Sequence, residues 1–225
     1  MSPKSDAIIL ISANAEWAAL RQIMKVKKCH NTPYGEWFVF IHEDREYIIM
    51  QGGWGKMAAA GSAQYAIDRW NPRLIVNLGT CGGFYGQVNR GEIILAKQTF
   101  VYDIIEQMGN PEQAILDRAV ELDLSWIKAV RPKNILLRNM VSADRDILPE
   151  DIPMLIKKYN AVAADWESGS IAWVAYLNNT RCLIMRGVTD LVGEDGGEVY
   201  GNYQAYVEAT QSVMIELVRL IGWWN

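Results

Sequence analysis

The sequence predicts one α/β domain spanning residues 1–225, in which helices cover both faces of a central, mixed, mostly parallel twisted sheet. The chain has 225 residues, of which 50% are hydrophobic, so a single domain can bury a sizeable core. Short apolar runs alternate with longer segments of helical periodicity. Neither a linker nor an internal repeat interrupts this alternation. The expected arrangement therefore has three layers, α/β/α.

The strands are predicted from apolar runs of strand length. Residues 37–41 and 47–50 are separated by the charged segment Glu43-Asp44-Arg45-Glu46, which predicts a hairpin. The remaining runs predict buried strands at residues 7–11, 74–78, 134–141 and 181–188, and another within residues 92–101.

Four segments show the periodicity of helices: residues 16–24, 57–70, 166–177 and 202–221. In the last of them, residues that suit a buried face recur at steps of three and four, which is the pattern of a helix lying on a sheet. These residues are Val207, Thr210, Val213, Met214, Leu217 and Leu220. Residues 109–133 mix charge with short helical runs and predict no single element.

The charge balance and the cysteine content exclude several classes of partner. The formal net charge is -4, from 22 basic and 26 acidic residues, so no basic field exists for a nucleic-acid backbone. Cys29, Cys81 and Cys182 are odd in number, far apart and outside any Cys/His cluster, which predicts a reduced, cytoplasmic protein without a metal site. His30 and His42 lie outside every polar cluster and are predicted to be surface or structural residues.

No segment predicts a membrane span or a secretory signal. No stretch reaches the roughly 18 apolar residues that a transmembrane helix needs. Residues 1–6 are polar and lead directly into the first predicted strand, without an apolar signal region followed by a cleavage site. We therefore expect no membrane partner, and a small molecule remains as the ligand class.

Polar and glycine-rich clusters follow successive predicted strands. Ligands of α/β sheets bind beyond the carboxyl ends of the strands, so these clusters predict one shared binding site. Around Gly79 and Cys81, the glycines allow close backbone approach to a flat or phosphorylated ligand, but the segment matches neither G-x-G-x-x-G nor the P-loop pattern. The clusters are residues 12–16, 52–56, 79–83, 142–146 and 189–190.

Three carboxylates in these clusters are candidates for chemical roles. Asp190 ends a predicted buried strand, where desolvation raises a carboxyl pKa and allows a proton donor near neutral pH. Glu167 could accept hydrogen bonds from a pair of ribose hydroxyls, and Glu16 could act as a general base on water. Each also has an ordinary structural interpretation, as a helix cap or as a first-turn acid that suits the helix dipole.

The ordered motifs resemble the nucleoside phosphorylase/nucleosidase superfamily, and within it the methylthioadenosine/S-adenosylhomocysteine nucleosidases. Five segments carry the resemblance over most of the chain. The first two segments are glycine-rich: residues 53–60, G-W-G-K-M-A-A-A, resemble G-I-G-K-V-x-A-A, and residues 77–83, N-L-G-T-C-G-G, resemble N-T-G-S-A-G-G. The other three follow in the chain, and the last two of them contain Glu167 and Asp190. Residues 141–144, V-S-A-D, resemble V-S-G-D; residues 165–167, D-W-E, resemble E-M-E; and residues 186–190, R-G-V-T-D, resemble R-A-I-S-D. The ordered set is specific, although no single segment is.

This resemblance implies a role for each matched residue at the base and the sugar. Asp190 would donate a proton to N7 of a purine while Thr189 helps to orient it. Glu167 would bind the ribose hydroxyls, and Trp166 would pack against the sugar. The implied fold is nucleoside phosphorylase-like.

The resemblance also implies how water and the rest of the substrate are held. Glu16, Thr80 and Arg186 would hold the attacking water, and Tyr200 would cover the ribose and its 5′ substituent. The implied reaction is hydrolysis of a 5′-substituted adenosine, such as methylthioadenosine or S-adenosylhomocysteine, in nucleoside catabolism and methionine salvage. The family further implies a homodimer with no metal or organic cofactor.

Several residues depart from the family pattern. Arg145 and Asp146 replace an aromatic-aliphatic pair that helps to wall the base and the 5′ pocket. Trp54 and Trp166 are bulkier than the usual residues at their positions, and Glu16 is the only carboxylate in the first loop. These differences leave the base and the 5′ substituent open.

Two other functions stay open. Phosphorylases of the superfamily carry an arginine in place of Asn77 and basic residues in the first loop, whereas residues 12–15 contain no arginine. Burying a phosphate dianion without cations is costly, so water is favoured as the nucleophile. If phosphate is used, Arg45 and Arg186 are the first candidates for its site. The third hypothesis is a non-catalytic nucleoside-binding protein of the same fold.

Overall fold

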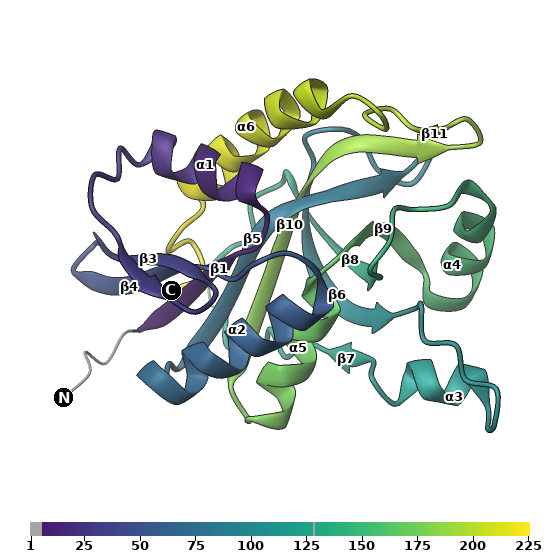
Figure 1. Cartoon of the computed structure of the whole chain (residues 1–225), viewed down its shortest axis with the longest axis horizontal. Helices are drawn as coiled ribbons and strands as arrows, with labels where there is room; N and C mark the ends of the chain where they lie inside the picture. Colours follow the sequence, from purple (N-terminus) through teal and green to yellow (C-terminus); the bar gives the residue numbers. More distant parts are fainter. Residues whose placement is uncertain (1–5, 128) are drawn as a thin grey trace.

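The computed structural model describes residues 6–127 and 129–225 (Figure 1). Residues 1–5, which belong to the segment predicted to lack a secretory signal, lie outside the described residues. The helices are α1 (Asn14–Ile23), α2 (Gly55–Trp70), α3 (Pro111–Leu116), α4 (Ile152–Tyr159), α5 (Ser168–Leu177) and α6 (Tyr203–Arg219). The strands are β1 (Ala7–Ile11), β2 (His30–Thr32), β3 (Gly35–His42), β4 (Arg45–Gln51), β5 (Leu74–Phe84), β6 (Ile93–Val101), β7 (Val120–Glu121), β8 (Ile135–Ser142), β9 (Ala161–Asp165), β10 (Arg181–Gly193) and β11 (Gly196–Gly197).

Within the described residues, these strands form one mixed sheet. Its order is β11-β10-β6-β8-β9-β5-β1-β4-β3-β2, with β7 beside β6. β1 pairs in parallel with β4 and β5, β5 with β10, and β8 with β6 and β9. Parallel pairing thus forms two groups, β4-β1-β5-β10 and β6-β8-β9, which meet in antiparallel pairs between β10 and β6 and between β5 and β9.

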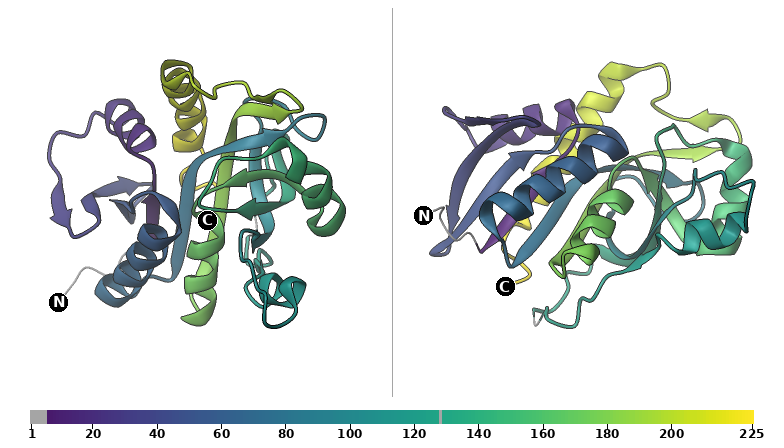
Figure 2. Two further views of the ribbon diagram at one scale, coloured as in Figure 1. Left: turned by 45° about the vertical axis from the view of Figure 1, so that its right-hand side comes forward. Right: turned by 60° about the horizontal axis from the view of Figure 1, so that its bottom comes forward.

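Helices cover the sheet on both faces, which confirms the predicted three layers. α1 and α6 pack together on one face, and α2 and α5 pack together on the other (Figures 1 and 2). Alternate residues of β1 enter the two cores between these layers. Ile8 and Leu10 join the core under α2 and α5, whereas Ile9 and Ile11 join the core under α1 and α6. Because both faces of β1 are covered, every position of this strand is apolar.

β5 and β10 are longer than the predicted strands, and through them the sheet closes on itself. The two strands pair in parallel over most of their length, while β10 also pairs with β6 and β5 also pairs with β9. Gly82 and Gly83 pair on both sides at this closure. A Cβ atom at Gly83 would lie 2.8 Å from a methyl carbon of Val188 on β10. Glycines predicted to allow ligand approach therefore also allow close strand packing.

Two segments that were predicted to follow strands lie inside those strands instead. Residues 79–83 belong to β5 itself. Thr189 and Asp190 lie inside β10, at a register shift that follows Val188, rather than after the strand. The prediction failed because polar residues and glycine end an apolar run in the sequence, whereas pairing on both sides continues the strand.

Other boundaries also differ. The hairpin turn consists of Glu43 and Asp44, both with left-handed φ of 49° and 61°, so Arg45 and Glu46 begin β4. α5 begins only at Ser168. α4 and β9 were not predicted, because α4 is short and β9 is rich in alanine, which favours strands weakly. α3 and β7 lie within the segment for which no element was predicted.

Two kinds of feature are absent from the described residues. None of the helices found there has the length and apolar character needed to cross a membrane. No group of three or more His, Cys, Asp or Glu side chains among the described residues could hold a metal ion.

Candidate active site

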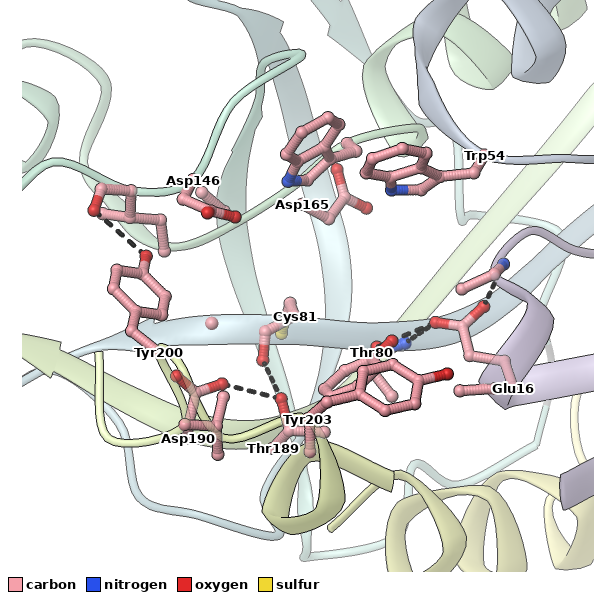
Figure 3. Close-up of a pocket in the computed structure, with 18 of the residues that line it drawn as sticks. Glu16, Trp54, Thr80, Cys81, Asp146, Asp165, Thr189, Asp190, Tyr200 and Tyr203 are labelled. Carbon is pink, nitrogen blue, oxygen red and sulfur yellow. Dashed lines mark hydrogen bonds between the residues drawn. The ribbon is translucent and has the colours of Figure 1, made fainter. Parts of the chain in front are cut away.

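The clusters predicted to form one site meet in a pocket of about 650 Å³ (Figure 3). It is lined by residues that follow β1, β8 and β9 and by residues near the carboxyl ends of β5 and β10. β8 and β9 run antiparallel to β5 and β10, and the closure of the sheet brings the two groups of strands together. Most of the predicted site residues line it. These are Glu16, Trp54, Thr80, Cys81, Arg145, Asp146, Trp166, Glu167, Thr189, Asp190 and Tyr200. Gly79 and Arg186 do not line it and are discussed below.

Asp190 is held at one end of the pocket as a largely desolvated carboxyl group that is 4% exposed. Its Oδ1 accepts a hydrogen bond from the Thr189 hydroxyl at 2.8 Å, and that hydroxyl also lies 3.2 Å from the Cys81 carbonyl oxygen. Among the described residues, Oδ2 has no hydrogen-bond partner. Burial, helped by the negative charges of Glu198 and Asp146, raises the pKa of Asp190. The arrangement suits a protonated Oδ2 that can donate to a ligand.

Glu16 lies toward the opposite end of the pocket, in the first turn of α1 (Figure 3). Its Oε1 accepts hydrogen bonds from the backbone N–H and the hydroxyl of Thr80, at 2.6 and 2.8 Å. Its Oε2 accepts one from the Ala13 N–H at 3.0 Å. Oε2 therefore carries fewer hydrogen bonds than Oε1 and retains a lone pair for a further donor, such as a water molecule.

Arg186 is fully buried beneath the pocket, which corrects its predicted role as a substrate-binding residue. Its Nε lies 2.8 Å from Asp165 Oδ2, and its Nη2 lies 2.6 Å from Asn77 Oδ1 and 3.2 Å from Glu167 Oε2. Its Nη1 lies 3.3 Å from the Thr80 carbonyl oxygen. The same Nη1 lies 3.6 Å from Oε1 of the Glu16 carboxylate. Its guanidinium is thus held by three hydrogen bonds and by ion pairs to three carboxyl groups, and it positions the carboxyl groups that face the ligand.

Gly79 provides the space for this guanidinium, which replaces its predicted contact with substrate. A Cβ atom at Gly79 would lie 2.2 Å from Arg186 Nη1 and 2.7 Å from Glu16 Oε1. A methyl group there would push apart the arginine and the glutamate. Glycine at this position therefore leaves room for a charged cluster beneath the pocket, which consists of Arg186, Glu16, Asp165 and Glu167.

Glu167 occupies the N-cap position of α5, without a capping hydrogen bond from its side chain, and joins the same cluster. Its Oε1 accepts a hydrogen bond from the Gly55 N–H at 3.1 Å, and its Oε2 contacts Arg186. Burial, with the nearby charges of Asp165 and Glu16, raises the pKa of Glu167 to about 8. Three carboxylates thus surround one guanidinium. Each oxygen of Glu167 retains capacity for a ligand hydroxyl.

Aromatic side chains line the mouth of the pocket. The rings of Trp54 and Trp166 stack with centroids 4.5 Å apart, and Trp54 is 63% exposed. From α6, Tyr203 and Tyr206 also line the pocket, and their rings lie 6.1 Å apart. The Tyr206 hydroxyl lies 3.5 Å from the Thr80 hydroxyl, which places it at the Glu16 end.

The sequence interpretation missed Tyr203 and Tyr206. Their spacing of three residues at the start of a predicted helix was the available signal, because it puts both rings on one face. Tyr200, by contrast, lies at the Asp190 end, where its hydroxyl donates to the Ile147 carbonyl at 3.0 Å. Tyr200, predicted to cover the sugar, is thus found in the pocket lining at the Asp190 end.

Comparison with known proteins gives a consistent family relationship. A sequence model of the phosphorylase superfamily matches residues 7–219. A 5'-methylthioadenosine/S-adenosylhomocysteine nucleosidase of Bacillus pumilus is 24% identical over 214 residues, covering 88% of this chain and 92% of the relative. One of Maridesulfovibrio salexigens is 27% identical over 187 residues, covering 78% and 81%.

Solved structures share the fold. The apo form of Arabidopsis thaliana 5'-methylthioadenosine nucleosidase matches with a TM-score of 0.81 and 21% identity, covering 99% of this chain and 97% of that chain. Futalosine hydrolase of Helicobacter pylori matches with a TM-score of 0.76 and 16% identity, covering 96% of both chains. At these identities the likeness establishes the architecture only.

Proposed function

The chain belongs to the phosphorylase superfamily, and on this premise we propose that it is a purine nucleosidase that hydrolyses the N-glycosidic bond of a 5′-substituted adenosine. The observation that carries the proposal is the opposition of two carboxyl groups across one pocket. Asp190 has a free, desolvated oxygen, and Glu16 is held by donors at the other end. Hydrolysis of a glycosidic bond needs an acid on the leaving group and a base on water at the opposite face of the sugar.

Asp190 is the proposed acid. The leaving purine gains negative charge as the bond breaks, and a proton on N7 removes it. Since Thr189 can donate to Oδ1, the proton of Asp190 can reside on Oδ2, which is free for the base. Its raised pKa keeps a fraction of the carboxyl group protonated at a pH where an ordinary aspartate is fully ionised.

Glu16 is the proposed base. The two hydrogen bonds from Thr80 fix its carboxylate, and Oε2 accepts the proton of a water molecule that attacks the anomeric carbon. The Tyr206 hydroxyl, beside that of Thr80, supports this arrangement. Products are then free base and free ribose sugar.

The charged cluster supports the transition state. As the base departs, positive charge develops on the ribose ring. Glu16, Asp165 and Glu167 outnumber Arg186, so the site remains negative even when Glu167 is protonated. A preorganised negative site close to the sugar favours this developing cation.

The same cluster disfavours phosphate as the nucleophile. Arg186 is fully buried outside the pocket lining and is paired with protein carboxyl groups, and Arg145, the cationic residue that lines the pocket, forms an ion pair with Asp151. A phosphate dianion would meet carboxylates without a free cation, which is costly.

For the substrate, we propose methylthioadenosine or S-adenosylhomocysteine, the compounds after which the relatives are named. Glu167 binds the ribose hydroxyls and Trp166 packs against the sugar. Tyr203 and Tyr206, rather than Tyr200, cover the sugar and its 5′ substituent, because they lie at the Glu16 end.

We further propose a cytoplasmic homodimer that acts in nucleoside catabolism and methionine salvage. Exposed apolar side chains near the pocket support the dimer: Trp54 is 63%, Met57 88% and Ile105 84% exposed. An ion pair between Lys56 and Asp103 joins the segments that carry them. Sedimentation velocity at micromolar concentration tests this assembly, and a monomer would remove it.

Product analysis tests the reaction. Methylthioadenosine and S-adenosylhomocysteine are incubated with the protein, with and without phosphate, and the products are identified by mass. We expect adenine and the free sugar at a rate that phosphate does not change. A ribose 1-phosphate product that appears only with phosphate would make the protein a phosphorylase, and binding without turnover would make it a nucleoside-binding protein.

A further inference from the structure

The Asp190 end of the pocket contains a second carboxylate that the proposed mechanism does not use. Asp146 follows β8, lines the pocket and is exposed to it. Figure 3 shows it with Tyr200 and Asp190 around this end. Its negative charge contributes to the raised pKa of both neighbours, which also indicates that they are close. Among the described residues, Asp146 has neither a hydrogen-bond donor nor an ion-pair partner.

Nearby cations are engaged elsewhere and leave Asp146 uncompensated. The guanidinium of Arg145 pairs with Asp151 and lies 5.2 Å from the centre of the Tyr102 ring. Arg90 is a cation whose charge lowers the pKa of Asp190, but its Nη2 forms an ion pair with Glu198 Oε1 at 2.6 Å. The carboxylate of Asp146 is therefore available to a ligand.

Tyr200 adds to the acceptor character of this end. Its hydroxyl proton is directed at the Ile147 carbonyl, 3.0 Å away, so the pocket meets the lone pairs of the phenol oxygen. Burial raises the pKa of Tyr200, so the phenol stays neutral. Of the three side chains Asp146, Tyr200 and Asp190, the one that donates into the pocket is Asp190, through the proton on Oδ2 that the proposed function commits to N7 of the base.

A purine bound in this way presents its position 6 beside N7. In a 6-aminopurine this position carries an amino group with two donors, whereas a 6-oxopurine carries an acceptor. A site built from acceptors pairs with the amino group but leaves an oxo group facing other acceptors. Such polar mismatch discriminates between analogues more strongly than shape does.

We propose that Asp146 is a specificity-determining residue that accepts a hydrogen bond from the 6-amino group of the base, so the pocket takes 6-aminopurine nucleosides in preference to 6-oxopurine nucleosides. The inference rests on the proposed function in one respect, the placement of N7 at Asp190. It concerns base selection and is separate from the identity of the nucleophile and of the 5′ substituent.

Binding of the free bases tests the inference without any need for turnover. Isothermal titration calorimetry of the full chain with adenine and with hypoxanthine gives the ratio of their Kd values. We expect the wild-type protein to favour adenine, and Asp146→Ala to reduce that preference by about ten- to a hundredfold, the range of a charge-assisted hydrogen bond. Asp146→Asn, whose amide can donate to an oxo group, should shift the ratio further toward hypoxanthine.

Asp195→Asn is the matched control, because it removes the same charge at an exposed position that does not line the pocket. It should leave the ratio unchanged. The kcat/KM ratio for adenosine and inosine, which share one sugar, provides the parallel kinetic measurement.

Each outcome decides the inference. It is overturned if wild-type protein binds both bases equally, if neither base binds, or if both Asp146 variants keep the wild-type ratio. An adenine preference that depends on Asp146, in a protein that cleaves no nucleoside, would support base selection and remove the proposed function. Hydrolysis with a ratio insensitive to Asp146 would support the function and remove this inference.

Discussion

The two ends of the pocket place carboxyl groups in contrasting surroundings. At one end, Asp190 receives one hydrogen bond, from Thr189, and its second oxygen is buried without a partner in the described part of the chain. At the other end, Glu16 receives three hydrogen bonds and lies 3.6 Å from Arg186. The first environment favours a proton, and the second supplies donors to a carboxylate. The difference teaches that surroundings, rather than residue type, divide acid and base duties.

The largest expected effect is at the acid end. Asp190→Asn keeps the size of the side chain and removes the transferable proton, so we expect normal folding and a loss of about a hundredfold to ten-thousandfold in kcat on a purine nucleoside. Steady-state assays of adenine release measure it. Asp195→Asn, at an exposed position outside the pocket, serves as control. Retention of the wild-type rate would remove the assignment.

The base end should give a smaller effect of a different kind. Glu16→Gln preserves an acceptor for the Thr80 hydrogen bonds but cannot take a proton from water. We expect kcat to fall by about a hundredfold with little change in KM, because a base on water acts mainly in the transition state. Glu194→Gln, also exposed and outside the pocket, is the control. A rise in KM at constant kcat would instead make Glu16 a binding residue.

Glu167 gives a second test of the comparison between the two ends of the pocket. It lies near Glu16, but its proposed role is to bind the ribose hydroxyls and not to activate water. At pH 9, above the raised pKa of Glu167, Glu167→Gln should weaken ribonucleosides more than 2′-deoxyribonucleosides, by about ten- to a hundredfold in kcat/KM for one charge-assisted hydrogen bond. Steady-state kinetics on the two sugars with one base measure the difference. Equal losses for both sugars would place Glu167 outside the ribose site.

A further effect, outside catalysis, is expected in the stability of the fold. The pKa of Glu167 is raised from its ordinary value of 4.5 to about 8, so between these values the folded protein holds a proton that the unfolded chain has lost. Stability must then fall as pH rises through that window and level off above it. Glu167→Gln should remove this part of the slope in urea unfolding from pH 5 to 9. Identical slopes in both proteins would contradict the raised pKa.

The position of this pocket could be predicted from the sequence, but its internal division could not. Ordered motifs after apolar runs identified Asp190, Glu16 and Glu167 as parts of one site. Parallel pairing of β1, β5 and β10 brings Glu16 and Asp190 to one edge, whereas Glu167 follows β9, which runs antiparallel to β5 and reaches the site through the closure of the sheet. Nothing in the local sequence of Arg186 distinguishes a buried positioning residue from a ligand-binding one. That distinction depends on acceptors contributed by Asn77, Asp165 and other distant residues.

Two further features also depended on tertiary contacts. Gly79 reads as a residue for ligand approach, yet its lack of a Cβ atom makes room for Arg186 and Glu16. Tyr200 and Tyr203 are three residues apart, but one lies before α6 and the other at its start, so they serve opposite ends of the pocket. The position at which α6 begins thus decides which tyrosine is proposed to cover the sugar, Tyr203 rather than Tyr200.

The division between the two ends is tested most directly by a riboside whose leaving group departs without a proton. On a nitrophenyl riboside, Asp190→Asn should keep kcat/KM within a few-fold of wild type, while on a purine nucleoside it loses at least about a hundredfold. Glu16→Gln should lose activity on both, because water must attack in either case. Equal losses of Asp190→Asn on the two substrates would contradict the account and make Asp190 a residue for binding or structure.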